Sequence, residues 1–410
     1  MSVSLRISRR TLQIYAIAAL PLAIAVIILA DSFIFNLSIG FNNFDNRFKR
    51  LDELKMQDAH SEAVLSLVQP TKVDIHGSSP PPAPVVGHGK KVFRAGNRLK
   101  PEVLGLFNST ELSRRFDSRV EEFFSANQCK VQFFMTWFAP VDSYGERELL
   151  AAESLFQTNP RSCLVIVSRS MDSRKGYQKF EPLITRGYRI RAITPDLWEL
   201  LKNTPGETWL TDIKNGSRDP GVIPLPQNLS NLIRLAVLYR YGGVYLDTDF
   251  IVLKDFSSLR NSIGAQSADV NGNWSRLNNA LLAFDKKHPL VYKFIEEFST
   301  TFNGNKWGHN GPYLVSRVVN STVGEIQHTN FTVMPTTAFY PVDWIQIGRF
   351  FSRPNDTDGE KLVESTVRRL HQSTYAVHLW NRQSKKLQVE EGSVIWRLLS
   401  QHCVICSQRA

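Results

Sequence analysis

Short apolar runs alternate with amphipathic segments from about Gln128 onward. Val131–Phe138 (VQFFMTWF) and Cys163–Ser168 (CLVIVS) have the length of strands, and each predicts a buried strand. Tyr188–Pro195 (YRIRAITP) predicts a further strand unit after them. Between the first two lies Glu146–Pro160 (ERELLAAESLFQTNP), whose apolar residues recur at helical spacing. This order predicts a parallel sheet with helices on its faces. Ligands of such sheets bind at the edge where the strands end.

A longer amphipathic segment, Asn228–Tyr241, predicts a helix with Ser230 as its N-cap. Gly242 is expected to end this helix, and the pair Gly242 and Gly243 permits a tight reversal of the chain. Val244–Leu253 (VYLDTDFIVL) then predicts one extended apolar segment that contains two acids.

The two acids, Asp247 and Asp249, are the unusual feature of that segment, because Asp is disfavoured inside strands. Side chains at i and i+2 of an extended chain share a face, so the carboxylates are expected to point the same way, about 7 Å apart. Such carboxylates repel each other unless a cation or a proton holds them. Since Mg²⁺ and Mn²⁺ prefer carboxylate and phosphate oxygens, the pair predicts a metal site that also binds a diphosphate.

Three interpretations of this D-x-D sequence compete. In the first, the acids only end a strand at a surface turn, against which the flanking apolar residues argue. In the second, they form the phosphatase signature D-x-D-x-[TV], but Ile251 stands where Thr or Val is required. In the third, they are the D-x-D of nucleotide-sugar glycosyltransferases, where a metal neutralises the leaving diphosphate.

The N-terminus predicts a membrane anchor. Leu12–Ala30 carries no charge and has 19 residues, against about 20 needed to cross a bilayer. Three arginines precede it and Asp31 follows it, so residues 1–11 are expected in the cytosol and the rest of the chain in the lumen. A cleaved signal peptide is the alternative, although its apolar core is usually only about 7–15 residues long.

A stem is predicted between the anchor and the catalytic body. Residues 31–127 lack a clear core pattern and include the proline-rich His76–Lys91, which favours extended polyproline II. The sequence therefore predicts a stem over 31–127 and one globular domain over 128–410.

Cysteines and glycosylation sequons agree with an oxidising lumen. The four cysteines allow three pairings, which the sequence alone does not resolve. We expect Cys129 with Cys163, because each precedes a run predicted to form neighbouring parallel strands, and Cys403 with Cys406. Zinc binding by Cys403 and Cys406 lacks an evident second ligand pair. The eight Asn-x-Ser/Thr sequons begin at Asn36, Asn108, Asn215, Asn228, Asn273, Asn320, Asn330 and Asn355.

Composition adds one exclusion. With 410 residues, of which 42% are hydrophobic and 21% charged, the chain is globular over most of its length. Its net charge of +11 is compatible with nucleic acid, an anionic membrane or an anionic substrate. Because the Lys and Arg residues are scattered and no nucleic-acid module is evident, we expect no nucleic-acid partner. Nothing indicates an oligomeric state.

Five ordered motifs give a more specific indication. The motifs are LSNLIRLAVLYRYGGVYLDTDFIVLKDFSSL from Leu229, LNNALLAFDKKHPL from Leu277, WGHNGPYLVSRV from Trp307, AFYPVDW from Ala338 and YAVHLWN from Tyr375. With these motifs, the sequence resembles the α-1,4-glycosyltransferase family from roughly Gln128 to Cys406.

The resemblance implies an α/β fold of the GT-A type: a Rossmann-like, mostly parallel central sheet with a small second sheet beside the D-x-D. It also implies a Golgi enzyme that moves a hexose, galactose in the best-known members, from a UDP-sugar to a glycolipid or glycan acceptor, with retention at the anomeric carbon. We expect same-face attack assisted by the departing phosphate, because no carboxylate nucleophile is evident. The implied cofactor is Mn²⁺ or Mg²⁺.

Residue roles follow from the matched positions. The resemblance implies metal binding by Asp247, Asp249 and His378, with the two acids central to catalysis. It implies donor binding by Asp247, Arg234, Asn231 and Asn278, and an acceptor side made by Trp307, His309, Gly311 and Pro312. Four of these residues also have a structural interpretation: a packed histidine for His378, a solvated helix charge for Arg234, a turn residue for Asn278 and a core residue for Trp307.

One departure concerns Asn231, where many relatives carry Asp, and this leaves the donor open. Transfer of mannose, glucose or N-acetylglucosamine to a sphingolipid or glycoprotein stays an alternative. A non-catalytic Golgi scaffold with the same fold is another.

Overall fold

The computed structural model describes residues 105–322 and 330–405, all within one compact unit of the chain, Gly77–Ala410. The predicted tail, the anchor over Leu12–Ala30 and the stem up to residue 104 lie outside the described residues. Among the helices that are described, none combines the length and apolar character needed to span a bilayer.

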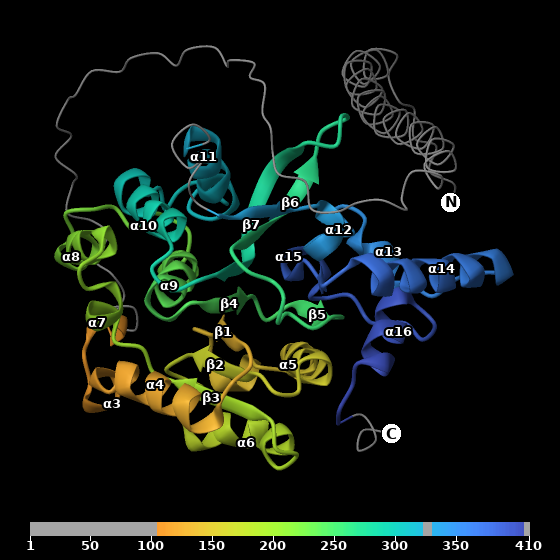
Figure 1. Cartoon of the computed structure of the whole chain (residues 1–410), viewed down its shortest axis with the longest axis horizontal. Coiled ribbons are helices and arrows are strands. Elements are labelled where there is room, and N and C mark those ends of the chain that lie inside the picture. The colour runs from red at the N-terminus through yellow and green to blue at the C-terminus, as the bar shows by residue number, and fades with distance from the viewer. Residues whose placement is uncertain (1–104, 323–329, 406–410) are drawn as a thin grey trace, which may run out of the picture. The chain divides into compact units, whose positions relative to one another are not determined.

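A seven-stranded sheet forms the centre of the unit, in the order β3-β2-β1-β4-β7-β6-β8 (Figure 1). Strands β1 to β4 run parallel, β7 is antiparallel to β4 and β6, and β8 is parallel to β6. A separate antiparallel pair is formed by β5 and β9. The seven strands are β1 Gln132–Thr136, β2 Cys163–Val167, β3 Arg189–Ile193, β4 Gly243–Leu246, β6 Ser262–Ala268, β7 Trp274–Phe284 and β8 Thr332–Met334, and the two-stranded sheet is β5 Phe250–Val252 with β9 Ala376–His378.

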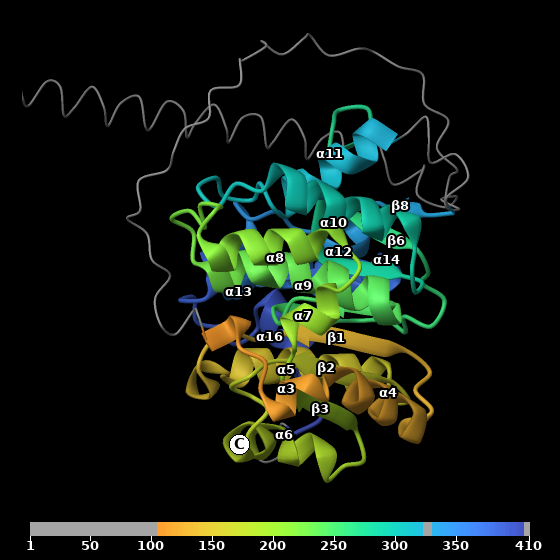
Figure 2. The ribbon, with the colours of Figure 1, turned by 90° about the vertical axis from the view of Figure 1, so that its left-hand side faces the viewer.

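Three apolar clusters hold helices against these sheets. One face of the large sheet packs under α4 and α7 to α11, and the other under α5, α6 and α12. Helices α13, α14 and α16 pack on the β5–β9 pair and form a third cluster (Figure 1). Figure 2 shows α10, α8 and α9 stacked above the plane of β1. The helices are α3 Glu111–Arg114, α4 Phe116–Asn127, α5 Glu146–Thr158, α6 Arg174–Ile184, α7 Leu197–Leu201, α8 Pro205–Asn215, α9 Leu225–Tyr241, α10 Pro289–Thr301, α11 Pro312–Thr322, α12 Thr336–Phe339, α13 Ile347–Phe351, α14 Thr357–Ser373, α15 Asn381–Ser384 and α16 Val394–Gln401, with 3₁₀ turns η1 Gly105–Phe107 and η2 Val141–Ser143.

The predicted strand–helix–strand order is confirmed by β1, α5 and β2, and the third predicted strand by β3. Strands β1 and β2 are nearly continuous apolar runs because helices cover both of their faces, and all five residues of β2 are buried. Strand β3, at the edge of the sheet, carries two arginines, of which Arg191 is exposed. The predicted disulfide between Cys129 and Cys163 is present. Cys406 lies outside the described residues, so its pairing with Cys403 stays a prediction.

Helix α9 begins three residues earlier than the sequence predicts, and Ser230 is not its N-cap. Pro224 is the capping residue and a second proline lies in the first turn, where the fixed φ of proline suits a helix start. Gly242 ends the helix as predicted, with a φ of 73°. At Gly243, whose φ is 100°, a Cβ would collide with the carbonyl oxygen of Gln132, so the turn requires glycine.

The folded unit reaches further towards the N-terminus than the predicted boundary at Gln128. Phe116, Val120, Phe123 and Phe124 of α4 are buried in the core, and Phe107 lies with them. Their spacing of four, seven and eight residues is that of one helix face. The stem predicted over 31–127 is therefore too long, because residues 105–127 pack in the core of the folded unit.

A buried ion pair fastens α4 to the sheet. Arg119 makes two bonds to Asp172, of 2.6 and 2.8 Å, and both side chains are about nine-tenths buried. Asp172 also accepts bonds from the backbone N–H and the hydroxyl of Thr194, just after β3. Burial alone would raise the pKa of Asp172, but the bonds from Arg119 and Thr194 outweigh it and hold the pKa below its usual value.

We predict that Asp172→Ala lowers the free energy of unfolding by about 3–5 kcal/mol, because Arg119 would be left as an unpaired buried charge. The lowered pKa stabilises the fold above the unfolded-state value of about 4, and that contribution is lost as pH falls through the lower folded-state pKa. Urea unfolding at pH 7 and at pH 3 measures both effects.

The matched control is Asp255→Ala. Asp255 forms an ion pair with Lys130 in which both side chains are roughly half exposed. Loss of this exposed ion pair should lower the free energy of unfolding by no more than about 1 kcal/mol. Equal losses for the two variants at pH 7 would show that α4 is not fastened in this way.

Candidate active site

The two acids lie where the chain leaves one sheet and enters the other. Strand β4 ends at Leu246 and β5 begins at Phe250, so Asp247 and Asp249 lie in the turn between them. The prediction of one continuous strand is therefore wrong. The reason is that β4 pairs with β1 and β7, whereas β5 pairs with β9, and the chain must turn to join both.

Asp249 is held on the side of the small sheet. Its Oδ2 accepts the backbone N–H of Asn381 at 2.9 Å, and its Oδ1 lies 3.3 Å from His378 Nε2. The β5–β9 register places Phe250 opposite His378, and this fixes the histidine beside the acid. Burial would raise the pKa of Asp249, but His378 and the Asn381 N–H outweigh it and lower the pKa.

Asp247 is held on the side of the large sheet by Arg234 and Tyr245. Arg234 approaches both of its carboxylate oxygens, at 3.0 and 3.3 Å, and the Tyr245 hydroxyl donates to Oδ1 at 2.7 Å. Burial raises the pKa of Asp247, and the positive charge of Arg234 opposes this shift without cancelling it. The charge of nearby Asp249 raises the pKa further.

Arg234 is a buried residue of α9 and not a solvated helix charge. Its guanidinium also donates to the Asn279 carbonyl at 2.8 Å and to the Ser230 hydroxyl at 3.2 Å, and it lies over the Tyr245 ring. Burial would lower the pKa of Arg234, but Asp247 raises it, so the side chain stays charged. It therefore sets the orientation of Asp247.

The side chains of Asp247, Asp249 and His378 fit a divalent cation. Each offers one ligand atom, and these atoms all lie within 4.8 Å of one another. Two carboxylates against one guanidinium leave a net negative charge, and the Nδ1 atom of His378 is buried with no hydrogen-bond partner among the residues described. Carboxylate oxygens with one imidazole suit Mn²⁺.

The two amide side chains predicted on the donor side, Asn231 and Asn278, lie beside Asn279 and make different hydrogen bonds. Asn231 accepts a bond from the Asn279 side chain at 2.9 Å, above the carbonyl that binds Arg234. Asn278, on β7, donates to Gln266 and accepts the N–H of Ala280, so both ends of its amide are already bonded within the fold. Asn279, which the sequence did not single out, is the amide that faces Asn231.

The predicted acceptor-side residues lie in the loop before α11 and at the first residue of that helix. A Cβ at Gly311 would lie 3.0 Å from the side-chain oxygen of Asn231, so glycine allows the close approach of this loop. Pro312 begins α11. His309 is directed to the Thr301 carbonyl, at 2.8 Å. Trp307 is 48% exposed, which excludes a core role, and its ring lies 3.9 Å from the guanidinium carbon of Arg382.

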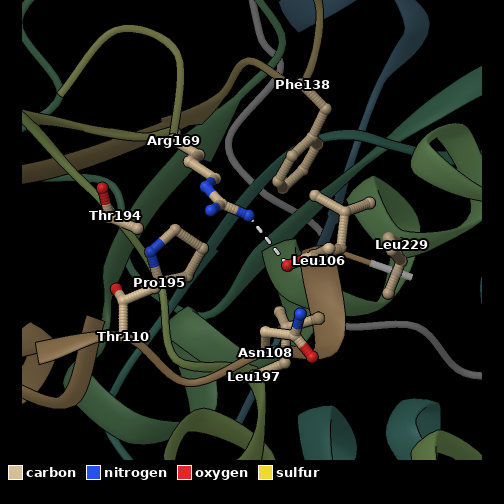
Figure 3. Close-up of a pocket in the computed structure, with 10 residues that line it drawn as sticks. Leu106, Asn108, Thr110, Phe138, Arg169, Thr194, Pro195, Leu197 and Leu229 are labelled. Atoms are coloured by element: carbon tan, nitrogen blue, oxygen red, sulfur yellow. Dashed lines mark hydrogen bonds between the residues drawn. The ribbon is translucent and has the colours of Figure 1, made fainter. Parts of the chain in front are cut away.

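A hollow lies at the carboxyl ends of the parallel strands (Figure 3). Phe138 follows β1, Arg169 follows β2, and Thr194 and Pro195 follow β3. Arg169 Nη1 donates to the Gly105 carbonyl at 2.8 Å, the dashed line in Figure 3. Leu229 also lines the hollow, and its neighbour Ser230 bonds Thr136, which bonds Tyr245. A chain of hydrogen bonds therefore links the helix segment beside the hollow to Tyr245, which donates to Asp247.

Some site residues were missed from the sequence. Tyr245 precedes Asp247 by two positions and shares its face, so strand alternation could have identified it. Asn381 contributes a backbone N–H, which leaves no signal in residue type. Asn279 could be recognised only once β7 was known to lie beside β4.

Comparisons with known proteins identify relatives of two parts of the chain. Residues 145–269 match the glycosyltransferase sugar-binding region containing the DXD motif, and residues 283–410 match the alpha 1,4-glycosyltransferase conserved region. Lactosylceramide 4-alpha-galactosyltransferase of Pongo pygmaeus is 34% identical over 222 residues, which cover 52% of this chain and 94% of that protein.

Two further relatives align over other lengths. Alpha-1,4-N-acetylglucosaminyltransferase of Homo sapiens is 26% identical over 51% of this chain and 58% of that protein. An uncharacterised protein of Arabidopsis thaliana is 29% identical over 74% of this chain, which spans 46% of that relative's length. Solved transferase structures superpose on the chain only in part, with TM-scores of 0.30 to 0.37.

We predict that Asp249→Asn lowers the affinity for Mn²⁺ by more than about 100-fold, since even changes in residues behind a metal's ligands cost about 10–100-fold. The fold should be kept, because the amide oxygen can still accept the Asn381 N–H. Calorimetric titration with Mn²⁺ alone measures the change.

The control is Asp269→Asn, because Asp269 also accepts backbone N–H groups but lies at the exposed end of a hairpin. Wild-type affinity for Mn²⁺ in the Asp249 variant would exclude Asp249 as a ligand.

Proposed function

The chain belongs to the α-1,4-glycosyltransferase family of enzymes, and on that premise we propose that it transfers galactose from UDP-galactose to a glycolipid or glycan acceptor, with a bound divalent cation and with retention. The observation that carries this proposal is the convergence of Asp247, Asp249 and His378 within 4.8 Å. The mostly parallel sheet, with a small antiparallel sheet beside these residues, supports a fold of the GT-A type.

The proposed cofactor is Mn²⁺, with Mg²⁺ as the second candidate. Asp247, Asp249 and His378 would hold it, and when bound it supplies positive charge to the leaving diphosphate. Arg234 keeps Asp247 oriented through two bonds, and the Asn381 N–H does the same for Asp249. These residues are preorganised by the fold, so little rearrangement is needed as charge develops on the diphosphate.

The donor and the acceptor are proposed to enter from different sides. The nucleoside would approach the carboxyl ends of the parallel strands, the edge at which such sheets bind ligands, where Phe138 follows β1 and Arg169 follows β2. The acceptor would approach past Gly311 and the exposed ring of Trp307, which offers a surface for a sugar. With both acids committed to the cation, attack from the face of the departing phosphate accounts for retention without a covalent intermediate.

A second donor, UDP-N-acetylglucosamine, is favoured by the relative with that activity. Both donors share the diphosphate that the acid pair would recognise, and the galactosyltransferase relative is the more similar of the two to this chain, at 34% against 26% identity.

We predict metal-dependent hydrolysis of UDP-galactose by the full-length chain in detergent, at a rate above that of UDP-N-acetylglucosamine. Asp247→Asn should lower kcat/KM by at least about 100-fold, since the charge on the diphosphate would lose its stabilisation. Release of UDP measures both. Faster hydrolysis of UDP-N-acetylglucosamine would select the second candidate donor. If the wild type binds UDP with the same affinity with and without Mn²⁺, the chain is a scaffold and not this enzyme.

We also propose that the enzyme is a single-pass type II protein of the Golgi with its catalytic unit in the lumen. The sequons at Asn108, Asn215, Asn273, Asn320, Asn330 and Asn355 are exposed, which agrees with this location. Asn228 is 3% exposed and its side-chain oxygen accepts a bond from Asn310.

Glycosylation tests the location. In secreting cells we predict that Asn355→Gln removes one glycan, while the buried Asn228 carries none in the folded enzyme. Peptide mass spectrometry before and after enzymatic deglycosylation measures the occupancy of each site. A chain without any glycan would contradict a lumenal catalytic unit.

A further inference from the structure

After β9, which carries His378, the chain enters the short helix α15, which is not stable by itself. Helix α15 is a single turn of four residues, Asn381–Ser384, too short to be stable alone. Trp380 before it has a φ of 53°, a left-handed conformation that is unfavourable for a bulky side chain. This turn therefore depends on contacts from elsewhere in the fold.

Arg147 of α5 supplies such contacts from 234 residues away in sequence. Its Nη1 donates to the Asn381 side-chain oxygen at 3.3 Å and to the Ser384 hydroxyl at 3.1 Å, and its Nη2 donates to the Leu387 carbonyl at 3.1 Å. The guanidinium also lies over the Phe351 ring, 5.0 Å from its centre. One planar fork thus bonds three points of the turn from two separate nitrogens, whereas a lysine would present all its donors from a single atom.

Asn381 and Ser384, the two residues of α15 that Arg147 bonds, are each connected to Asp249 by further hydrogen bonds. Asn381 gives its backbone N–H to the Asp249 carboxylate at 2.9 Å. Ser384 donates its hydroxyl to the Leu379 carbonyl at 2.5 Å, and the Leu379 N–H bonds the Asp249 carbonyl at 2.8 Å. The bonds of Arg147 therefore reach the side chain and the backbone of the same acid.

We propose that Arg147 is a positioning residue for the cation site, acting through α15 on Asp249 and His378. This inference rests on the proposed function, because it concerns the ion that the proposed reaction uses. Arg147 touches neither acid in the structure, so its role is geometric: it fixes the turn against α5 and thereby fixes the spacing of the ligand atoms.

Whether the affinity for Mn²⁺ falls or rises when Arg147 is removed separates a positioning role from an electrostatic one. A positive group near the acids repels a cation, so if Arg147 acted through its charge alone, removing it would tighten Mn²⁺ binding. If the turn only contributed to global stability, the affinity of the folded variant would not change. A positioning role predicts weaker binding.

The test is titration of full-length wild type, Arg147→Ala and Arg147→Lys with Mn²⁺ alone, following free Mn²⁺ by electron paramagnetic resonance. We expect both variants to bind about 10–100-fold more weakly, the effect usual for residues that orient metal ligands. The lysine variant keeps the charge and loses the fork, so it should not restore affinity. Thermal unfolding shows that each variant is folded.

Arg218→Ala is the matched control. Arg218 also donates to a backbone carbonyl, that of Ser299, and its contacts join α8 to α10. The Arg218 variant should bind Mn²⁺ with the affinity of the wild type. Unchanged or tighter binding in both Arg147 variants would overturn the proposal while the proposed function stands. Failure of the wild type to bind Mn²⁺ would overturn both.

Discussion

Repulsion between two neighbouring carboxylates is the constraint on which the site depends. Asp247 and Asp249 place ligand oxygens within 4.8 Å of one another, in a partly dry setting. Two unit charges at such a separation repel by about 3–4 kcal/mol at an effective dielectric constant near 20. Arg234 offsets one charge, while a neutral backbone N–H and His378 stabilise the other, so about one negative charge is left over. A bound divalent cation would supply the missing positive charge.

The fold creates this arrangement by joining two sheets at one turn. Strand β4 belongs to the large sheet, with Arg234 on the helix before it, and β5 belongs to the small sheet, with His378 on its partner strand. Each acid therefore takes its bonding partners from the elements of a different sheet. Strands β4 and β5 share one apolar cluster, and the distance between the acids is set by the turn that joins them and by the elements that brace it, α9 on one side and α15 with Arg147 on the other.

The sequence predicted the parts whose signals are local. Buried strands, α5, the end of α9 at Gly242 and the pairing of Cys129 with Cys163 follow from apolar runs, helical period and glycine chemistry. It failed where tertiary contacts decide: the strand break at Asp247–Asp249 depends on which sheet each half joins, and the start of the folded unit depends on the apolar face of α4. Asn278, chosen by its place in a motif, is bonded within the fold, whereas Asn279 faces Asn231 because β7 pairs with β4.

The most direct measurement of the central claim is the anomalous diffraction of a crystal of this protein soaked with Mn²⁺ and UDP. We predict one manganese peak in contact with Asp247, Asp249 and His378 and with diphosphate oxygens, while Arg234 keeps its bonds to Asp247. A manganese peak elsewhere, or UDP bound at full occupancy with the three side chains free of metal, would contradict it.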